Sequence, residues 1–120
     1  MFIKKLKDCP KFISGDKAIL RELLHAEKGG FKFRYSLAHA IVKPGKVTTP
    51  HKLKTSEVYY ILNGLGLMHI DQESARVSSG CAVYIRPRAT QYIKNIGRSD
   101  LVFLCIVDPA WCREDEEIIK

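Results

Sequence analysis

The chain has 120 residues, of which 46% are hydrophobic and 28% are charged, and this balance excludes a disordered chain. Its longest unbroken apolar run spans residues 101–107, which is far too short for a membrane-spanning helix. The N-terminal segment interrupts its apolar positions with lysines and contains no secretory core segment. We therefore expect a soluble cytoplasmic protein that folds as a single domain over residues 1–120.

The formal charge of +7 is distributed unevenly along the chain. Residues 108–120 hold five acidic and two basic side chains and so carry −3, which leaves +10 on the preceding 107 residues. A basic body of this kind can attract nucleic acid or an anionic metabolite. No recognised nucleic-acid motif accompanies the charge, so we expect a small-molecule ligand as the partner, and neither nucleic acid nor a membrane.

The N-terminal third contains one ambiguous segment and one clear strand. Residues 17–25, KAILRELLH, are mostly good helix formers, and propensity alone favours a short helix that Gly29-Gly30 soon ends. In residues 31–42, bulky residues alternate with smaller or charged ones, and this two-residue period predicts a strand. We expect the bulky face of this strand to pack inward. Pro44-Gly45 then ends the strand.

Short strands and turns follow through the middle of the chain. Residues 58–62 are rich in branched and aromatic side chains, and Asn63-Gly64 follows with the residue types of a tight hairpin turn. Residues 67–70 are the expected partner strand of that hairpin. Further strands are expected at residues 82–85 and 91–95. Short strands divided by turns at this spacing indicate an all-β sandwich or barrel.

The last strand and the C-terminus differ in pattern. Residues 101–107 are apolar at every position, as expected of a strand that is covered on both faces. Asp108 is a good helix N-cap and Pro109 suits the first helical position. The acidic residues 114–117 suit the positive end of a helix dipole. We therefore expect a short C-terminal helix after the last strand.

His51 and Glu57 are the first residues that point to chemistry. On a strand, positions 51, 53, 55 and 57 share one face, so both side chains could point into a barrel. An imidazole and a carboxylate in one cavity can hold a divalent metal ion. Such a pair also occurs by chance, and a solvated Glu57 with a surface His51 is the alternative.

The spacing around these two residues resembles the first motif of the cupin family, which is Gly, five residues, His-x-His, three or four residues, Glu, six residues, Gly. In this chain it reads Gly45-KVTTP-His51-Lys52-Leu53-KTS-Glu57-VYYILN-Gly64 and departs from the pattern only at Leu53, which replaces the second His. Residues 80–95, GCAVYIRPRATQYIKN, resemble the second motif of the family. They match it at Gly80, Val83, Tyr84, Ile85, Pro87 and Asn95. Arg88 stands in place of that motif's Gly, and Gln91 in place of its His.

The resemblance implies a double-stranded β-helix, or jelly roll, with a core barrel over about residues 33–107. It also implies that residues 17–25 form a strand, against their helix propensity. Because cupins of this kind are commonly dimeric, the resemblance further implies a homodimer.

A typical cupin metal site has three His and one Glu, and the resemblance carries over His51 and Glu57, with Gln91 at the position of the last ligand. Leu53 cannot coordinate, whereas the carbonyl oxygen of a glutamine can do so weakly. The implied site is therefore a weak one for a divalent ion such as Zn, Mn, Fe or Ni. The alternative is that these three side chains hydrogen-bond to one another, or hold a water or a small ligand.

Three further residues are candidates for contact with a ligand. Tyr59 shares its strand face with Glu57 and is our candidate proton donor, with core packing as the alternative. Arg86 and Arg88 flank Pro87 near the expected rim of the barrel, where guanidinium groups could hold a phosphate or carboxylate. A surface role is the alternative for both arginines.

Three classes of function stay open at this point. The first is a metal-assisted enzyme that performs Lewis-acid, isomerase-like chemistry on a small oxygenated metabolite, sugar-like or anionic. The second is a non-catalytic cupin that binds such a ligand, and we rank it slightly below the enzyme. The third is a basic surface that recruits a polyanion.

Overall fold

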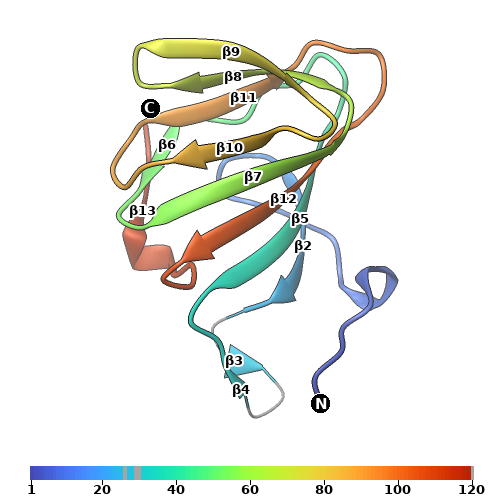
Figure 1. Ribbon diagram of the computed structural model, residues 1–120, viewed down its shortest axis with the longest axis vertical. Coiled ribbons are helices and arrows are strands. Elements are labelled where there is room, and N and C mark those ends of the chain that lie inside the picture. Colours follow the sequence, from blue (N-terminus) through green and yellow to red (C-terminus); the bar gives the residue numbers. More distant parts are fainter. Residues whose placement is uncertain (26, 29–30, 120) are drawn as a thin grey trace.

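The computed structural model describes residues 1–25, 27–28 and 31–119, and these residues are built almost entirely from strands (Figure 1). The helical elements of this part are two single 3₁₀ turns, η1 (Leu6–Asp8) and η2 (Arg113–Asp115). The prediction of an all-β barrel is therefore confirmed. Within the described residues, no helix is long and apolar enough to cross a membrane.

The larger of the two main sheets has six strands, and every neighbouring pair in it is antiparallel. Its order is β1 (Phe12–Ile13), β2 (Ile19–Leu24), β5 (Ser36–Val42), β12 (Leu101–Asp108), β7 (Ser56–Asn63) and β10 (Ala82–Ile85).

The second main sheet has five strands and is also antiparallel. Its order is β13 (Glu116–Ile118), β6 (His51–Leu53), β11 (Gln91–Asn95), β8 (Leu65–Ile70) and β9 (Glu73–Ser78). A short ribbon of β3 (Glu27–Lys28) and β4 (Phe31–Lys32) projects from one end of the molecule (Figure 1).

The hydrophobic core lies between the two main sheets. Ile61 and Phe103 reach into it from the six-stranded sheet, and Ile93 and Met68 from the five-stranded one; none of the four is more than 3% exposed. Full burial of such a side chain contributes about 1.5–3 kcal/mol to stability. The core fixes the distance between the sheets and so the space that remains beside it.

The structure decides between helix and strand for residues 17–25. Residues 19–24 form β2, which pairs with β5 in a register that places Arg21 opposite His39. The helix that propensity favoured is therefore wrong, and the strand implied by the resemblance is correct. Pairing with β5 supplies long-range hydrogen bonds that outweigh a weak local preference. The expected break at Gly29-Gly30 lies outside the described residues.

The predicted strand at residues 31–42 is divided, and the expected orientation of its faces is wrong. Residues 31–32 belong to β4 and residues 36–42 to β5. On β5 the small side chains of Ser36 and Ala40 are buried, whereas Leu37 and Ile41 are half-buried on the outer face. The small inner side chains leave room for a cavity, which bulky ones would fill.

Asn63-Gly64 makes a turn, but the predicted hairpin is wrong. The strand before it, β7, pairs with β12 and β10, whereas the strand after it, β8, pairs with β11 and β9. The turn therefore carries the chain from one sheet to the other. Gly64 has φ +94° and packs against the backbone of Asp100, so it meets two demands that only glycine satisfies.

The predicted C-terminal helix is also wrong. Asp108 ends strand β12, and the chain reaches strand β13 through the single 3₁₀ turn η2. In β13, Glu116 lies opposite Leu53 and Ile118 opposite His51 of β6. Edge pairing with β6 gives these backbone groups partners that the helix signals at Asp108 and Pro109 could not anticipate.

Candidate functional site

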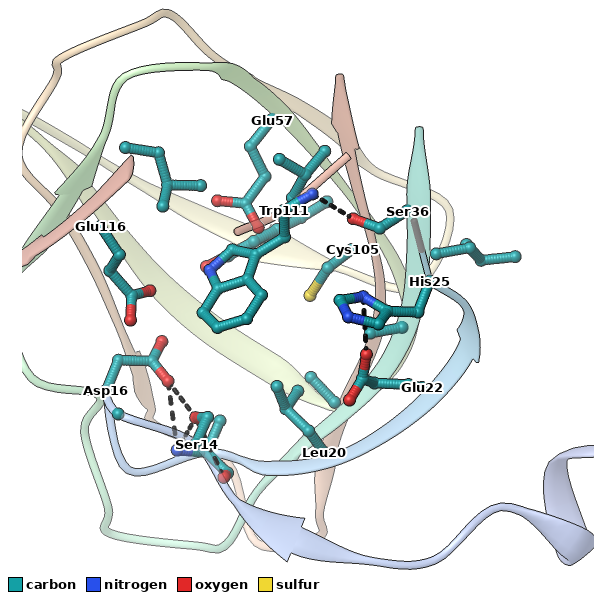
Figure 2. A pocket seen from close by; sticks show the side chains of 18 of the residues that line it. Ser14, Asp16, Leu20, Glu22, His25, Ser36, Glu57, Cys105, Trp111 and Glu116 are labelled. Atoms are coloured by element: carbon teal, nitrogen blue, oxygen red, sulfur yellow. Dashed lines mark hydrogen bonds and ion pairs between the residues drawn. The ribbon is translucent and has the colours of Figure 1, made fainter. Parts of the chain in front are cut away.

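A cavity of about 140 Å³ lies beside the core, between the inner face of the six-stranded sheet and strands β6 and β13 (Figure 2). Small side chains on β5 and just before β2, including Ala18, Ala38 and Ala40, form part of its wall. A cavity of this size can hold a ligand about as large as benzene. Polar side chains enter it from strands of both main sheets and from the loops that flank them.

His51 is fixed from behind and presents one ring nitrogen to this cavity. Its side chain lies on β6 and is almost completely buried. Nδ1 lies 2.9 Å from the carbonyl oxygen of Thr49, and because a carbonyl can only accept, Nδ1 carries the proton of this hydrogen bond. Nε2 then faces Asp16, whose Oδ2 lies 3.6 Å away. In its neutral form His51 therefore has a free lone pair on Nε2.

Tyr59, Gln91 and Glu57 form a buried chain of hydrogen bonds. The Tyr59 hydroxyl donates to Oε1 of Gln91 at 2.9 Å, and Nε2 of Gln91 donates to Oε1 of Glu57 at 2.9 Å. The Glu57 carboxyl at the end of the chain points into the cavity (Figure 2). Because the Tyr59 proton is directed at Gln91, Tyr59 here orients Gln91; its predicted role as proton donor stays a prediction.

The Glu57 carboxyl is held in its neutral form. Burial raises the pKa of Glu57 to about 8, and the nearby carboxylates of Asp16 and Glu116 act in the same direction. The hydrogen bond from Gln91 lowers the pKa but does not compensate for the burial. At neutral pH, Glu57 can therefore donate a proton to a ligand.

Asp16 and Glu116 are site residues that the sequence analysis missed. Asp16 precedes β2 and accepts a hydrogen bond from the Ser14 hydroxyl, and Glu116 comes from β13 (Figure 2). Burial raises the pKa of Glu116, as does repulsion from Asp16, whereas the proximity of His51 lowers it. The expected helix concealed Glu116, because only the alternation of a strand separates it from the exposed Glu117.

Trp111 and a His–Glu pair also line the cavity. The backbone N–H of Trp111 donates to the Ser36 hydroxyl at 3.0 Å, which holds the indole over the cavity (Figure 2). Nδ1 of His25 lies 3.0 Å from Oε2 of Glu22. No sequence pattern signalled this pair, whose members come from one strand and the residue after it.

The expected metal ligands meet in space, but their geometry fits a metal ion poorly. Both polar ends of the Gln91 amide are engaged, since its oxygen accepts from Tyr59 and its nitrogen donates to Glu57. Leu53 offers no ligand atom. Over residues 1–25, 27–28 and 31–119, no three His, Cys, Asp or Glu side chains are grouped so as to hold a metal ion. Whether a divalent ion binds at His51, Glu57 and Gln91 stays a prediction.

Arg86 and Arg88, the two residues predicted to bind an anion, lie away from this site. The Arg86 guanidinium pairs with Asp71 on the surface. The backbone N–H of Arg88 donates to the carbonyl of Leu53 at 2.7 Å, and Arg88 lies beside Lys52 in a shallow surface depression. Neither arginine lines the cavity. Their predicted role in ligand binding is therefore not supported by proximity to His51 and Glu57.

Sequence comparison places residues 38–107 within a known family, the Cupin domain. A related chain, an uncharacterized protein of Methanocaldococcus jannaschii, is 45% identical over 112 residues. That match covers 91% of this chain and 87% of the relative.

Two solved structures illustrate the likeness of fold. A predicted oxalate decarboxylase from Thermotoga maritima is 21% identical with a TM-score of 0.78, and the match covers 90% of this chain and 99% of that one. Pac13, a nucleoside dehydratase from Streptomyces, is 14% identical with a TM-score of 0.81, and the match covers 100% of this chain and 92% of that one. At these identities the likeness shows the fold alone.

Proposed function

Given that this chain belongs to the Cupin domain family, we propose that it binds a small oxygenated metabolite in the barrel cavity and catalyses proton transfer on it. One observation carries the proposal: Nε2 of His51 and the carboxyl group of Glu57 face the same cavity, and each is held from behind by a hydrogen bond. Groups that are fixed in this way make effective general acids and bases.

The two side chains have complementary tasks in this proposal. Nε2 of His51 removes a proton from a carbon next to a carbonyl group, and the electron pair of that C–H bond forms the C=C bond of an enol. Glu57 donates its proton to the carbonyl oxygen as this bond forms. Asp16, whose Oδ2 lies 3.6 Å from Nε2, stabilises the imidazolium that results. Return of the proton to a different carbon is an isomerisation, and loss of a hydroxyl is a dehydration.

The raised pKa of Glu57 supports the role of this residue as the acid, because a carboxyl group with an ordinary pKa is ionised at pH 7. The enzymatic neighbours on this fold, a predicted decarboxylase and a dehydratase, favour catalysis over binding alone. The Lewis-acid scheme expected from the sequence has less support, since Gln91 is turned toward Tyr59 and Glu57.

Proton exchange in D₂O tests the proposal without knowledge of the natural substrate. A panel of small hydroxyaldehydes and hydroxyketones is incubated with the protein, and loss of the proton next to the carbonyl is followed by NMR. We expect His51→Asn and Glu57→Gln to slow exchange by about 100-fold or more, the range of general acid–base catalysis. His69→Asn is the matched control, because His69 stacks on Tyr92 away from the cavity.

If the panel binds but wild type and His51→Asn exchange at the same rate, the catalytic proposal is overturned and the non-catalytic ligand-binding cupin replaces it. Elemental analysis of protein purified without a metal-affinity tag distinguishes the metal-assisted scheme from proton transfer by His51 and Glu57 alone. Loss of a stoichiometric ion in both His51→Ala and Gln91→Ala, together with loss of exchange after chelation, would favour that scheme. We expect exchange to persist after chelation.

A further inference from the structure

The cavity wall has a charge composition opposite to that of the whole chain. It carries four carboxyl groups, and its basic groups are the imidazoles of His25 and His51. None of the described residues that line it is a lysine or an arginine, although the chain has 20 of these against 13 acidic residues. The four carboxyl groups belong to Asp16, Glu22, Glu57 and Glu116.

Three of these carboxyl groups converge on one part of the cavity. Asp16 and Glu116 point toward each other from opposite chain segments, and Glu57 points toward the same space from β7 (Figure 2). Glu57 is only 6% exposed, and among the described residues its single hydrogen bond is the one that Oε1 accepts from Gln91. Oε2 of this buried group is thus aimed at the cavity with no protein donor to meet it.

The carboxylates of Asp16 and Glu116 face each other and repel, and in a medium of low dielectric this repulsion is stronger than in water. A positive charge placed between them relieves the repulsion and satisfies the unmet acceptors. Aromatic rings add to the attraction, because Trp111 and Tyr59 line the same space and an aromatic face attracts a cation. A carboxylate or phosphate ligand would meet repulsion from the same groups.

We propose that the ligand of this cavity carries a protonated amine, which is held between Asp16 and Glu116 beside the Trp111 indole. This inference rests on the proposed function and narrows it, since the substrate becomes a small oxygenated amine and not an anionic metabolite. The cavity volume of about 140 Å³ limits that substrate to roughly the size of a substituted benzene ring.

Calorimetric titration with three probes of one shape tests the proposal: benzylamine, benzyl alcohol and benzoate. We expect wild-type protein to bind benzylamine most tightly and benzoate least. Glu116→Gln removes one carboxylate and should weaken benzylamine binding by about tenfold, while it leaves benzyl alcohol binding unchanged. Glu117→Gln is the matched control, because the next side chain of β13 is exposed and lies outside the cavity.

Asp16→Asn provides a second variant in case Glu116→Gln disturbs the pairing of β13 with β6. Equal binding of benzylamine and benzoate, or unchanged benzylamine binding in both variants, would overturn the amine proposal. Stoichiometric uptake of Mn²⁺ or Zn²⁺ that competes with benzylamine and disappears in Glu116→Gln would instead make the cation a metal ion and overturn it as well.

The amine proposal and the proposed function can fail separately. If neutral hydroxyketones undergo His51-dependent exchange but benzylamine does not bind, the amine proposal fails and the catalytic one stands. If benzylamine binds as expected but no amino-ketone or hydroxyketone undergoes exchange, the catalytic proposal fails while the amine site stands.

Discussion

Gln91 shows how a single replacement changes the hydrogen bonds of a site while a polar side chain is kept there. The position that carries an imidazole in the family pattern here carries an amide, which can donate at one end and accept at the other. This polarity lets Gln91 join the Tyr59 hydroxyl to the Glu57 carboxyl at 2.9 Å on each side. The replacement of the second His by Leu53 is of another kind, since that side chain is buried and contributes only packing.

The buried Glu57 carboxyl makes stability depend on pH in a predictable direction. The pKa of Glu57 is about 8 in the folded chain, compared with an ordinary value of 4.5. Between these values the unfolded chain releases a proton that the folded chain keeps, so stability falls as pH rises. Over this interval we expect wild type to lose roughly 3–5 kcal/mol relative to Glu57→Gln, whose amide has no proton to release.

Urea unfolding at pH 5 and pH 8 measures this difference. The amide oxygen introduced by Glu57→Gln can still accept the hydrogen bond from Gln91, so the variant keeps the geometry of the chain of hydrogen bonds. Glu117→Gln controls for the loss of an acidic side chain on the surface and should follow wild type. Parallel pH dependence in wild type and Glu57→Gln would show that Glu57 ionises at the same pH in the folded and unfolded chains.

Among the individual residues, the sequence predicted the part of the site that lies on one continuous segment. His51 and Glu57 were found because the two-residue period of a strand places them on one face. Asp16 and Glu116 reach the same cavity from points 35 and 65 residues away from His51. No local pattern relates residues at such distances, and only the pairing of β13 with β6 brings Glu116 to the site.

At the scale of elements, strands were predicted more reliably than their partners. Residues 58–62 and 67–70 lie in β7 and β8 as expected, but the two strands belong to different sheets. Side-chain patterns report which face of a strand is buried, whereas strand pairing is decided by contacts between distant segments. The same reason explains why residues 116–118 join β6 as a strand although their flanking signals favour a helix.

The need for glycine at position 64 can be tested by a matched pair of substitutions. A Cβ on Gly64 would lie 2.6 Å from the carbonyl oxygen of Asp100, whereas one on Gly80 meets nothing within 4 Å. Both glycines have similar φ values, +94° and +92°. We expect Gly80→Ala to cost about 1 kcal/mol for its backbone strain and Gly64→Ala about 2–4 kcal/mol, since the clash is added.

Chemical unfolding of the two variants gives these free energies directly. Equal losses would mean that the backbone around Asp100 yields to the new methyl group without cost. A larger loss in Gly64→Ala would show that the close approach of the turn to Asp100, and not the turn alone, requires glycine.

At the scale of the whole molecule, the outer face of the six-stranded sheet departs from the sequence pattern. Residues 101–107 are apolar throughout, and we expected both faces of this strand to be covered. In the structure Leu101 and Phe103 are buried on the inner face, but Ile106 is 37% exposed on the outer face. The expectation is therefore wrong for the single chain, because nothing within the described residues fully covers that outer face.

The exposed apolar side chains of this outer face form one patch across three strands. Register places Val58 of β7 between Tyr84 of β10 and Ile106 of β12, and Tyr60 follows two residues later on the same face. The patch residues Tyr60, Leu62, Tyr84 and Ile106 are each more than a third exposed. Contiguous exposed apolar surface of this kind marks an interaction site.

We predict that a second copy of the chain covers this patch and that the two copies form a two-fold symmetric dimer. Two copies with a charge of +7 repel each other, so contact is favoured where it brings no like charges together, and the patch residues Tyr60, Leu62, Tyr84 and Ile106 are uncharged. Such a contact would also cover the second face of residues 101–107.

Sedimentation analysis should give about twice the chain mass of 13.6 kDa for wild type. Tyr84→Glu should give the monomer, because it buries a charge in both halves of a symmetric contact. Val47→Glu, at another exposed apolar position, opposite Lys94 of the other sheet, should remain dimeric. A wild-type monomer, or a Tyr84→Glu dimer, would mean that this apolar face is not where two copies meet.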